Sequence, residues 1–396
     1  MILCSRSSRS KGLATVLLPD KNGSAFFELF EYLASMQFLS AEKIFTGEEW
    51  LQNHAVVVNN NMIEDILPLS SITSSVKYFD NSFIAPAFID LQIYGAAGKL
   101  LAVYPEKDSL VKLVEYCRYG GAAYCMPTVA THPYETFYEC IDAVKEYWNG
   151  GGKGVPGLHI EGPWISYEKK GAHIAECIHI PTIGQVRQLL EYGKGVIKII
   201  TLAPEVCSKE IIDFILSYDI IISAGHSSAT YDEATGAFNS GVTAATHLYN
   251  AMSPLQHRNP GMVGAIMDHS HVMASIIPDG YHVDYAAIRI AKQVMKERLF
   301  AITDAVTETG TGYYPHHLAG DKYESNGILS GSALTMVKAV KNLVEHCNIE
   351  PGEALRMCSL YPARVMGLQN RLGLIKKNYE ASLVVMSNDL STVSIL

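Results

Sequence analysis

Short apolar runs alternate with longer helical stretches from residue 83 to residue 303 of the chain. Eight of these runs have the composition of buried strands: 83–93, 122–126, 157–160, 196–202, 220–224, 242–246, 272–277 and 299–303. Alternation of short apolar strands with helices is typical of parallel βαβ units whose sheet is covered on both faces. Eight units in succession favour a (β/α)8 barrel over an open doubly wound sheet. No G-x-G-x-x-G follows a strand, which also argues against a dinucleotide-binding fold.

Strand patterns also flank the predicted barrel on both sides. Residues 55–58 and 62–63 surround Asn59-Asn60-Asn61 and predict a hairpin, and residues 381–385 predict a strand near the other end. We therefore expect an α/β protein: a (β/α)8 TIM-type barrel with a small β-sandwich domain built from both chain ends. The expected boundaries are 1–41 for an N-terminal extension, 42–82 for the first part of the small β domain, 83–365 for the barrel and 366–396 for the second part.

The N-terminal extension, residues 1–41, fits poorly with the pattern that follows it. Residues 5–10 are rich in serine and arginine and predict disorder, whereas residues 25–38 are consistent with a short amphipathic helix. Two interpretations stay open. The extension is either disordered, with Met36 as the true start, or it forms an ordered additional helix.

Composition and charge narrow the class of protein. Of the 396 residues, 48% are hydrophobic and 18% are charged, as expected for a globular chain with a large core. The net charge of −9 and the lack of a basic stripe argue against nucleic-acid binding. No apolar run is long enough for a membrane-spanning helix, and the N-terminus lacks a signal-peptide pattern. Eight scattered cysteines without a C-x-x-C pair predict free thiols in a reducing compartment, the cytoplasm.

Ionisable residues gather at the predicted strand ends, where a barrel carries its active site. They end or follow the third, fifth, sixth, seventh and eighth strands as Glu161, His226, His247, Asp279 with His282, and Asp304. One glutamate and two histidines are a ligand set of catalytic zinc, which leaves one position for water. An aspartate outside that set is able to move a proton to and from the water and the leaving group.

Each of these residues also has an ordinary structural explanation. A single histidine at a strand end is more often hydrogen-bonded than metal-bound. Glu161 could cap the turn that follows it, and Asp304 could form an N-cap or an Asx turn. The joint occurrence at one end of one barrel favours the metal site.

Six stretches of the sequence, in the order of the chain, resemble a known family. They read HIEGPW (159–164), SAGHSSATYDEA (223–234), THLYNAMSPLQHRNPG (246–261), PDGYHVDY (278–285), TDAVTETG (303–310) and LSGSALTM (329–336). The chain resembles the N-acetylglucosamine-6-phosphate deacetylases of the amidohydrolase superfamily from about residue 44 to residue 387. The resemblance implies hydrolysis of the acetamide of N-acetyl-D-glucosamine 6-phosphate to D-glucosamine 6-phosphate and acetate, in amino-sugar catabolism and cell-wall sugar recycling.

The resemblance also implies roles for individual residues. Glu161, His226 and His247 are the expected ligands of a divalent metal ion, zinc or alternatively iron(II), and Asp304 is the expected catalytic base and acid. His173, in the stretch KKGAH, is expected to polarise the acetamide carbonyl. Arg258 and His282 are expected to contact the phosphate and the sugar. The further substrate-binding residues are Ala172, Asn250, Ala251, Asp279, Gly280, Tyr281, Leu329, Ser330 and Gly331.

The sequence departs from the wider superfamily at the end of the first strand. Many amidohydrolases have His-x-His there to hold a second metal ion, whereas this chain reads Gln92-Ile93-Tyr94. We therefore expect one metal ion per subunit. Relatives continue beyond the position of Leu396, so the second part of the small domain is expected to be shortened. The family resemblance further suggests a homodimer, in which Arg258 could serve the neighbouring site.

Three alternative functions each predict features that the sequence can be compared with. Deacetylation of N-acetylgalactosamine 6-phosphate stays open, because one hydroxyl orientation depends on loop contacts. A cyclic amidase of the dihydroorotase or allantoinase type would need His-x-His, and Gln92 with Tyr94 speak against it. A barrel that binds sugar phosphate without turnover would need a lost ligand or base, yet Glu161, His226 and Asp304 are all present.

Overall fold

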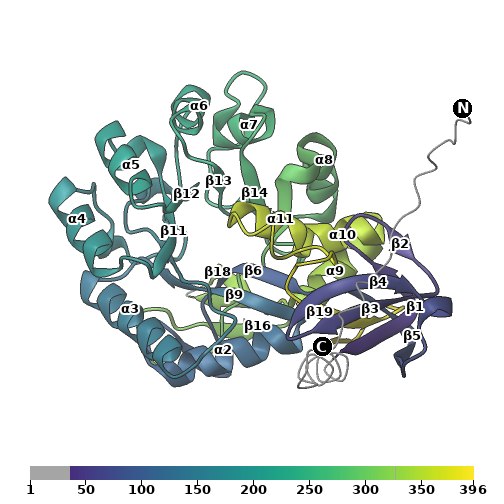
Figure 1. Ribbon diagram of the computed structural model, residues 1–396. Helices are drawn as coiled ribbons and strands as arrows, with labels where there is room; N and C mark the ends of the chain where they lie inside the picture. Colours follow the sequence, from purple (N-terminus) through teal and green to yellow (C-terminus); the bar gives the residue numbers. More distant parts are fainter. Residues whose placement is uncertain (1–35, 326) are drawn as a thin grey trace, which may run out of the picture.

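The computed structural model describes residues 36–325 and 327–396, and they form a barrel with a smaller β domain beside it (Figure 1). The alternatives of a disordered segment or an extra helix in residues 1–35 lie outside the described residues. The first strand starts at Gln37, ahead of the boundary expected at residue 42.

The barrel consists of one eight-stranded parallel sheet. Its strands, in the order of the sheet, are β15 (Leu299–Ala301), β14 (Met273–Ile276), β13 (Ala244–Ala245), β12 (Ile221–Ala224), β11 (Ile197–Leu202), β10 (Leu158–Glu161), β9 (Ala122–Ala130) and β6 (Phe88–Ile93). The first and last strands meet where the Asp304 N–H donates to the Gln92 carbonyl at 2.9 Å and the Tyr94 N–H donates to the Ala305 carbonyl at 2.9 Å. The predicted (β/α)8 barrel is confirmed.

Helices follow the strands in sequence and cover the outside of the barrel (Figure 1). They are α2 (Lys107–Tyr119), α3 (Tyr134–Asn149), α4 (Ile183–Tyr192), α5 (Lys209–Leu216), α6 (Tyr231–Asn239), α7 (Gly261–Asp268), α8 (Tyr285–Met295), α9 (Met336–Glu345), α10 (Pro351–Cys358) and α11 (Leu360–Val365). Capping boxes start two of them: Thr182 with Gln185 caps α4, and Thr230 with Glu233 caps α6. In the described part of the chain, no helix has the length and apolar character needed to cross a bilayer.

The small β domain is built on one seven-stranded sheet. Its strands are β1 (Gln37–Phe45), β2 (Trp50–Leu51), β3 (His54–Asn59), β4 (Met62–Pro68), β5 (Lys77–Pro86), β19 (Leu383–Ser387) and β20 (Val393–Ile395), with the main order β20-β19-β5-β1-β3-β4. Both chain ends therefore contribute strands, as the pattern predicted. The predicted hairpin is β3–β4, where Asn60 and Asn61 take positive φ values of 48° and 61°, as a two-residue hairpin turn requires.

The run 83–93, which the sequence pattern presents as one strand, belongs to two. β5 ends at Pro86 in the small sheet, and β6 begins at Phe88 in the barrel. Both halves are buried, so hydrophobicity does not change where the chain passes from one sheet to the other. Ala87 connects the two strands, so the chain passes there from the sheet of the small domain into the sheet of the barrel.

Short antiparallel strands lie beyond the barrel strands that carry the site. They are β7 (Gly95–Ala96) with β8 (Lys99–Leu100), and β16 (His317–Ala319) with β17 (Lys322–Ser325) and β18 (Ile328–Ser332). The β18 segment joins the barrel through the Val306 N–H, which donates to the Ser332 carbonyl at 3.1 Å. This places β18 next to Asp304.

Candidate active site

The carboxylate of Glu161 lies at the centre of the strand-end cluster. It ends β10, its side chain is buried, and five side chains surround its two oxygens. Around Oε1 lie nitrogen atoms of Gln92 at 3.1 Å, His247 at 3.0 Å and His226 at 3.3 Å. The Tyr94 hydroxyl donates to Oε2, and His173 Nε2 lies 3.4 Å from the same atom.

Glu161, His226 and His247 fit a divalent metal ion. Their ligand atoms lie within 4.8 Å of one another, and all three residues are buried. The two Nε2 atoms are 3.1 Å apart, and they lie 3.3 Å and 3.0 Å from Glu161 Oε1. Ligand atoms that surround one tetrahedral zinc at its usual bond lengths are separated by about 3.3 Å. The three donors are therefore already spaced as ligands of a single ion.

The backbone at these positions aims the side chains into the barrel mouth. His226, His247 and Asp304 each follow a barrel strand and have positive φ values of 48°, 37° and 55°. Non-glycine residues rarely adopt this conformation, and each one costs on the order of 1–3 kcal/mol. Such strain persists where the surrounding packing holds it, and it gathers here at one end of the barrel.

Hydrogen bonds settle which ring nitrogen of His226 faces the ion site. Its Nδ1 lies 2.8 Å from the Lys169 carbonyl and so carries the proton, which leaves the Nε2 lone pair for a metal. His247 Nδ1, in contrast, is buried without a partner in the described residues. The Nε2 atom of His247 is the one that meets Glu161 and His226.

Burial and partners act in opposite directions on the pKa values of the cluster. Burial opposes ionisation of Glu161, but the histidines around it hold the pKa of this carboxyl well below its ordinary value. Burial also opposes a charge on His247, yet the nearby Glu161 raises the pKa of that imidazole. The cluster thus places a carboxylate where a cation is strongly stabilised.

His173 approaches the cluster from the loop between β10 and α4. The Thr131 N–H donates to His173 Nδ1 at 3.3 Å, and the Thr131 hydroxyl lies 2.7 Å from the same nitrogen. A nitrogen that accepts from a backbone N–H is unprotonated, so the proton of the neutral ring lies on Nε2, toward the cavity. Burial lowers the pKa of His173 to about 4, which keeps the ring neutral at pH 7.

Asp304 belongs to the wall of the same cavity. Burial raises the pKa of its carboxyl above the ordinary value, although His247 and His282 act against this. Its Oδ2 is 4.0 Å from His282 Nε2, and its Oδ1 is buried without a hydrogen-bond partner among the residues described. His282 Nδ1 in turn contacts Asp279 Oδ2 at 2.6 Å. Asp279 therefore orients His282, and His282 faces Asp304.

A cavity of about 180 Å³ joins these groups. Among the substrate-binding residues expected from the sequence, the cavity wall contains Ala172, His173, Asn250, Ala251, His282, Leu329, Ser330 and Gly331. The other four expected substrate-binding residues do not belong to the cavity wall. Asp279 lies behind His282, Gly280 packs against Tyr285, and Tyr281 and Arg258 are exposed outside the wall.

Sequence reasoning missed several residues that hold the cluster together. Gln92 and Tyr94 stand out in the sequence only because they replace His-x-His, and this replacement does not predict their hydrogen bonds to Glu161. Thr131, which fixes the tautomer of His173, has no motif of its own. His316, which contacts Ser330 Oγ at 2.8 Å, was also missed. Gln92 and Tyr94 could have been found from their position at a strand end, next to the expected ligands.

Comparison with known families and proteins agrees with this geometry. The amidohydrolase family matches residues 83–394, and the NagA composite domain matches residues 37–80. The chain belongs to the amidohydrolase family. This amidohydrolase is 34% identical to the N-acetylglucosamine-6-phosphate deacetylase of Haemophilus influenzae, over 88% of this chain and 95% of that protein. It is 32% identical to an N-acetylgalactosamine-6-phosphate deacetylase of Escherichia coli O157:H7, over 89% and 95% of the two chains.

Solved structures of amino-sugar deacetylases resemble the fold of this chain. The N-acetylglucosamine-6-phosphate deacetylase of Pasteurella multocida aligns with a TM-score of 0.85 at 34% identity, over 90% of this chain and 97% of that one. A mutant of the Mycobacterium smegmatis deacetylase in complex with N-acetyl-D-glucosamine-6-phosphate aligns with a TM-score of 0.84 at 26% identity, over 91% and 98%. The barrel and the small β domain of this amidohydrolase therefore have the arrangement of amino-sugar deacetylases.

The hydroxyl of Tyr94 offers a direct test of the support around Glu161. Tyr94→Phe removes the donor to Glu161 Oε2 and keeps the ring, so we expect the affinity for zinc to fall by about 10–100-fold. Competition with a chromogenic chelator measures this affinity without any substrate. Tyr134→Phe, which removes a hydroxyl bonded to Trp164, is the matched control. Equal zinc affinity in the two variants would show that Tyr94 does not support the ligand.

Proposed function

We propose that this amidohydrolase hydrolyses the acetamide of N-acetyl-D-glucosamine 6-phosphate to D-glucosamine 6-phosphate and acetate, in amino-sugar catabolism and the recycling of cell-wall sugars. The observation that carries the proposal is the convergence of Glu161, His226, His247 and Asp304 in one cavity. The relatives named above support the substrate class. They include one enzyme named for the galactosamine epimer, and the glucosamine epimer is proposed because most of the similar proteins are named for it.

Glu161, His226 and His247 are proposed to hold one divalent ion, zinc by preference and iron(II) as the alternative. When bound, such an ion polarises the amide carbonyl and lowers the pKa of water toward neutrality, so that hydroxide is available for attack. Gln92 and Tyr94 support a single ion. Both donate to Glu161 where the wider superfamily places imidazole ligands for a second one.

The amide carbonyl needs a hydrogen-bond donor because negative charge develops on its oxygen during attack. His173 is the proposed donor. It is neutral, its Nδ1 accepts from Thr131, and its Nε2–H points to the side of the cavity where Glu161 lies. Asn250 and Ala251, which also belong to the wall, are proposed to contact the sugar.

Asp304 is proposed to take the proton of the attacking water and to give it to the departing nitrogen. Its raised pKa suits both steps, because the carboxyl group is able to hold the proton between them. His282, fixed by Asp279, is proposed to help bind the sugar next to Asp304. The loop that contains Leu329, Ser330 and Gly331 is proposed to close the cavity over the substrate.

The phosphate needs a cation that the cavity itself lacks. No lysine or arginine belongs to the wall of this cavity, and Arg258 is exposed outside it. We propose that the protein is a homodimer in which Arg258 of one copy binds the phosphate in the site of the other. The free, mostly buried cysteines of the described chain fit a reducing compartment, and we propose the cytoplasm.

Acetate release from N-acetylglucosamine 6-phosphate is the first measurement. We expect activity that is lost after dialysis against a chelator and restored by zinc, because the three ligands supply the only proposed ion site. The N-acetylgalactosamine 6-phosphate epimer, assayed in parallel, is expected to react more slowly. A folded, zinc-loaded protein that releases no acetate from either sugar phosphate would contradict the proposal.

The Asp304→Asn variant tests the proposed role of Asp304 as catalytic base. Turnover should fall by about 100- to 10,000-fold, because the amide does not accept the proton that the carboxylate takes. Zinc content, measured by elemental analysis, should stay at that of the parent protein, since Asp304 is not a proposed ligand. Asp213→Asn, an exposed substitution on α5, is the control. Turnover near that of the parent would remove Asp304 from its role.

Arg258→Ala tests the source of the phosphate contact. Loss of a charge-assisted hydrogen bond should raise KM for N-acetylglucosamine 6-phosphate by about 10–100-fold, with a much smaller effect on unphosphorylated N-acetylglucosamine. The Arg187→Ala variant on α4 is the charge-matched control. Mixing Arg258→Ala with Asp304→Asn subunits should restore activity, because a mixed dimer contains one intact site. Mixtures that stay inactive, although subunits exchange, would contradict delivery of Arg258 by the partner copy.

A further inference from the structure

A second and larger cavity lies between the barrel and the small β domain. Its volume is about 830 Å³, and none of its wall residues belongs to the cavity around Glu161. The wall comes from the β3–β4 hairpin, one side of α2, the start of β9, the end of α3 with the glycine-rich loop 150–154, and two segments near the C-terminus, 380–382 and 395–396. Ala123 and Tyr124 belong to the start of β9, and the loop 150–154 precedes β10. The cavity therefore lies next to the strand ends opposite to those of the active site.

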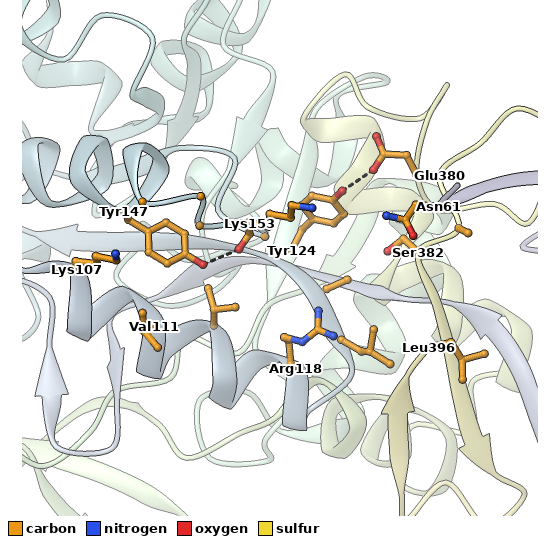
Figure 2. Close-up of a pocket in the computed structure, with 18 of the residues that line it drawn as sticks. Asn61, Lys107, Val111, Arg118, Tyr124, Tyr147, Lys153, Glu380, Ser382 and Leu396 are labelled. Carbon is orange, nitrogen blue, oxygen red and sulfur yellow. Dashed lines mark hydrogen bonds between the residues drawn. The ribbon is translucent and has the colours of Figure 1, made fainter. Parts of the chain in front are cut away.

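Three cations contribute to this wall. Lys107 and Arg118 come from α2, and Lys153 comes from the loop that follows α3 (Figure 2). Within residues 36–325 and 327–396, none of the three forms an ion pair or a side-chain hydrogen bond. This is unusual in a chain whose net charge is −9, where carboxylates outnumber cations. Glu380 is the one acidic side chain that the described wall contains.

Glu380, in the wall, and Asp108, next to Lys107 in the sequence, both have other partners. Glu380, which belongs to the wall, accepts from Arg371 Nε at 2.9 Å and from the Tyr124 hydroxyl at 2.5 Å (Figure 2). Asp108, which follows Lys107, contacts Lys99 at 2.8 Å and Lys112 at 3.5 Å. Neither carboxylate therefore forms an ion pair with a cation of the wall.

The loop 150–154 brings its lysine and its backbone close to α2. The Tyr147 hydroxyl donates to the Lys153 carbonyl at 2.7 Å and fixes the loop (Figure 2). At Gly150, an added Cβ would come within 2.4 Å of Lys107 Nζ, so the absence of a side chain lets the ammonium group lie against the loop. A glycine at this position thus shapes one end of the cationic cavity.

The remaining wall suits an organic group. Val111 and Val114 lie between the two cations in the sequence of α2, and Tyr124 and Tyr147 also belong to the wall. Figure 2 shows both tyrosines on the side of the cavity opposite to Val111. Lys107 and Arg118 are eleven positions apart, which is about 16 Å along a helix axis. A single small anion does not fill this length, whereas an elongated ligand with a charged end and an organic part does. A volume of this size is within the range of small-molecule sites.

We propose that this cavity is a binding site for an organic polyphosphate of the size of a nucleoside diphosphate, bound by Lys107, Arg118 and Lys153 and distinct from the active site. The phosphates lie between the cations, which bind them through charge-assisted hydrogen bonds. The organic part lies along the valines of α2 and the two tyrosine rings.

Calorimetric titration of the full chain with ADP, without magnesium, tests the proposal. The parent protein should bind with a Kd below about 1 mM. The triple variant Lys107→Ala, Arg118→Ala, Lys153→Ala should bind at least tenfold more weakly. A charge-matched triple variant, Lys112→Ala, Arg187→Ala, Lys194→Ala, removes three cations that do not belong to the wall and should bind like the parent protein. Thermal unfolding of all proteins checks that the fold is kept.

Further ligands separate the contribution of the phosphates from that of the organic part. Pyrophosphate should bind more weakly than ADP, and adenosine should give no heat. Gly150→Ala, which displaces the Lys107 ammonium, should weaken ADP binding without a change in the number of charges. The proposal is overturned if the parent protein does not bind ADP, if the cavity triple variant binds it as tightly as the parent, or if adenosine binds as tightly as ADP.

Discussion

The buried carboxylate of Glu161 is the group on which the organisation of the barrel mouth depends. An ionised carboxyl group without water is costly unless several donors or a cation compensate it. Here, Gln92, Tyr94, His173, His226 and His247 all approach its two oxygens. They come from β6 and its end, from the loop after β10 and from the ends of β12 and β13. One charge thus determines the position of residues that are far apart in the sequence.

His226 and His247 reach this charge, and Asp304 reaches the cavity beside it, because the backbone turns directly after the strands. Positive φ values at His226, His247 and Asp304 direct their side chains inward rather than along the strand. Hydrogen bonds hold two of these turns: the Ser166 N–H donates to the His226 carbonyl at 2.8 Å, and the Ser332 N–H donates to the Asp304 carbonyl at 3.0 Å. Local strain is therefore balanced by contacts with neighbouring elements, which is how pre-organised sites are built.

The parts of the site that lie in regular strand-end positions were predictable from the sequence, and the parts that depend on loops were not. The parallel strands of a barrel all end at its mouth, so a polar residue that ends or follows an apolar run is predicted to lie there. Glu161 and His247 follow this rule. The contact between Thr131 and His173 spans 42 positions and depends on how two loops meet. The division of 83–93 into two strands was missed because hydrophobicity is the same in both sheets.

The two ends of the barrel differ in the ionisable side chains that they contain. At the mouth, Glu161, Asp279 and Asp304 are buried among imidazoles, and no lysine or arginine belongs to the cavity wall. This arrangement suits a metal ion and proton transfer, since imidazole and carboxylate groups exchange protons near neutral pH. Beside the opposite strand ends, Lys107, Arg118 and Lys153 form no ion pair within the described residues. Catalytic cavities need groups that titrate, whereas lysine and arginine keep their charge at all physiological pH values. The second set is therefore suited to holding an anion and unsuited to moving protons.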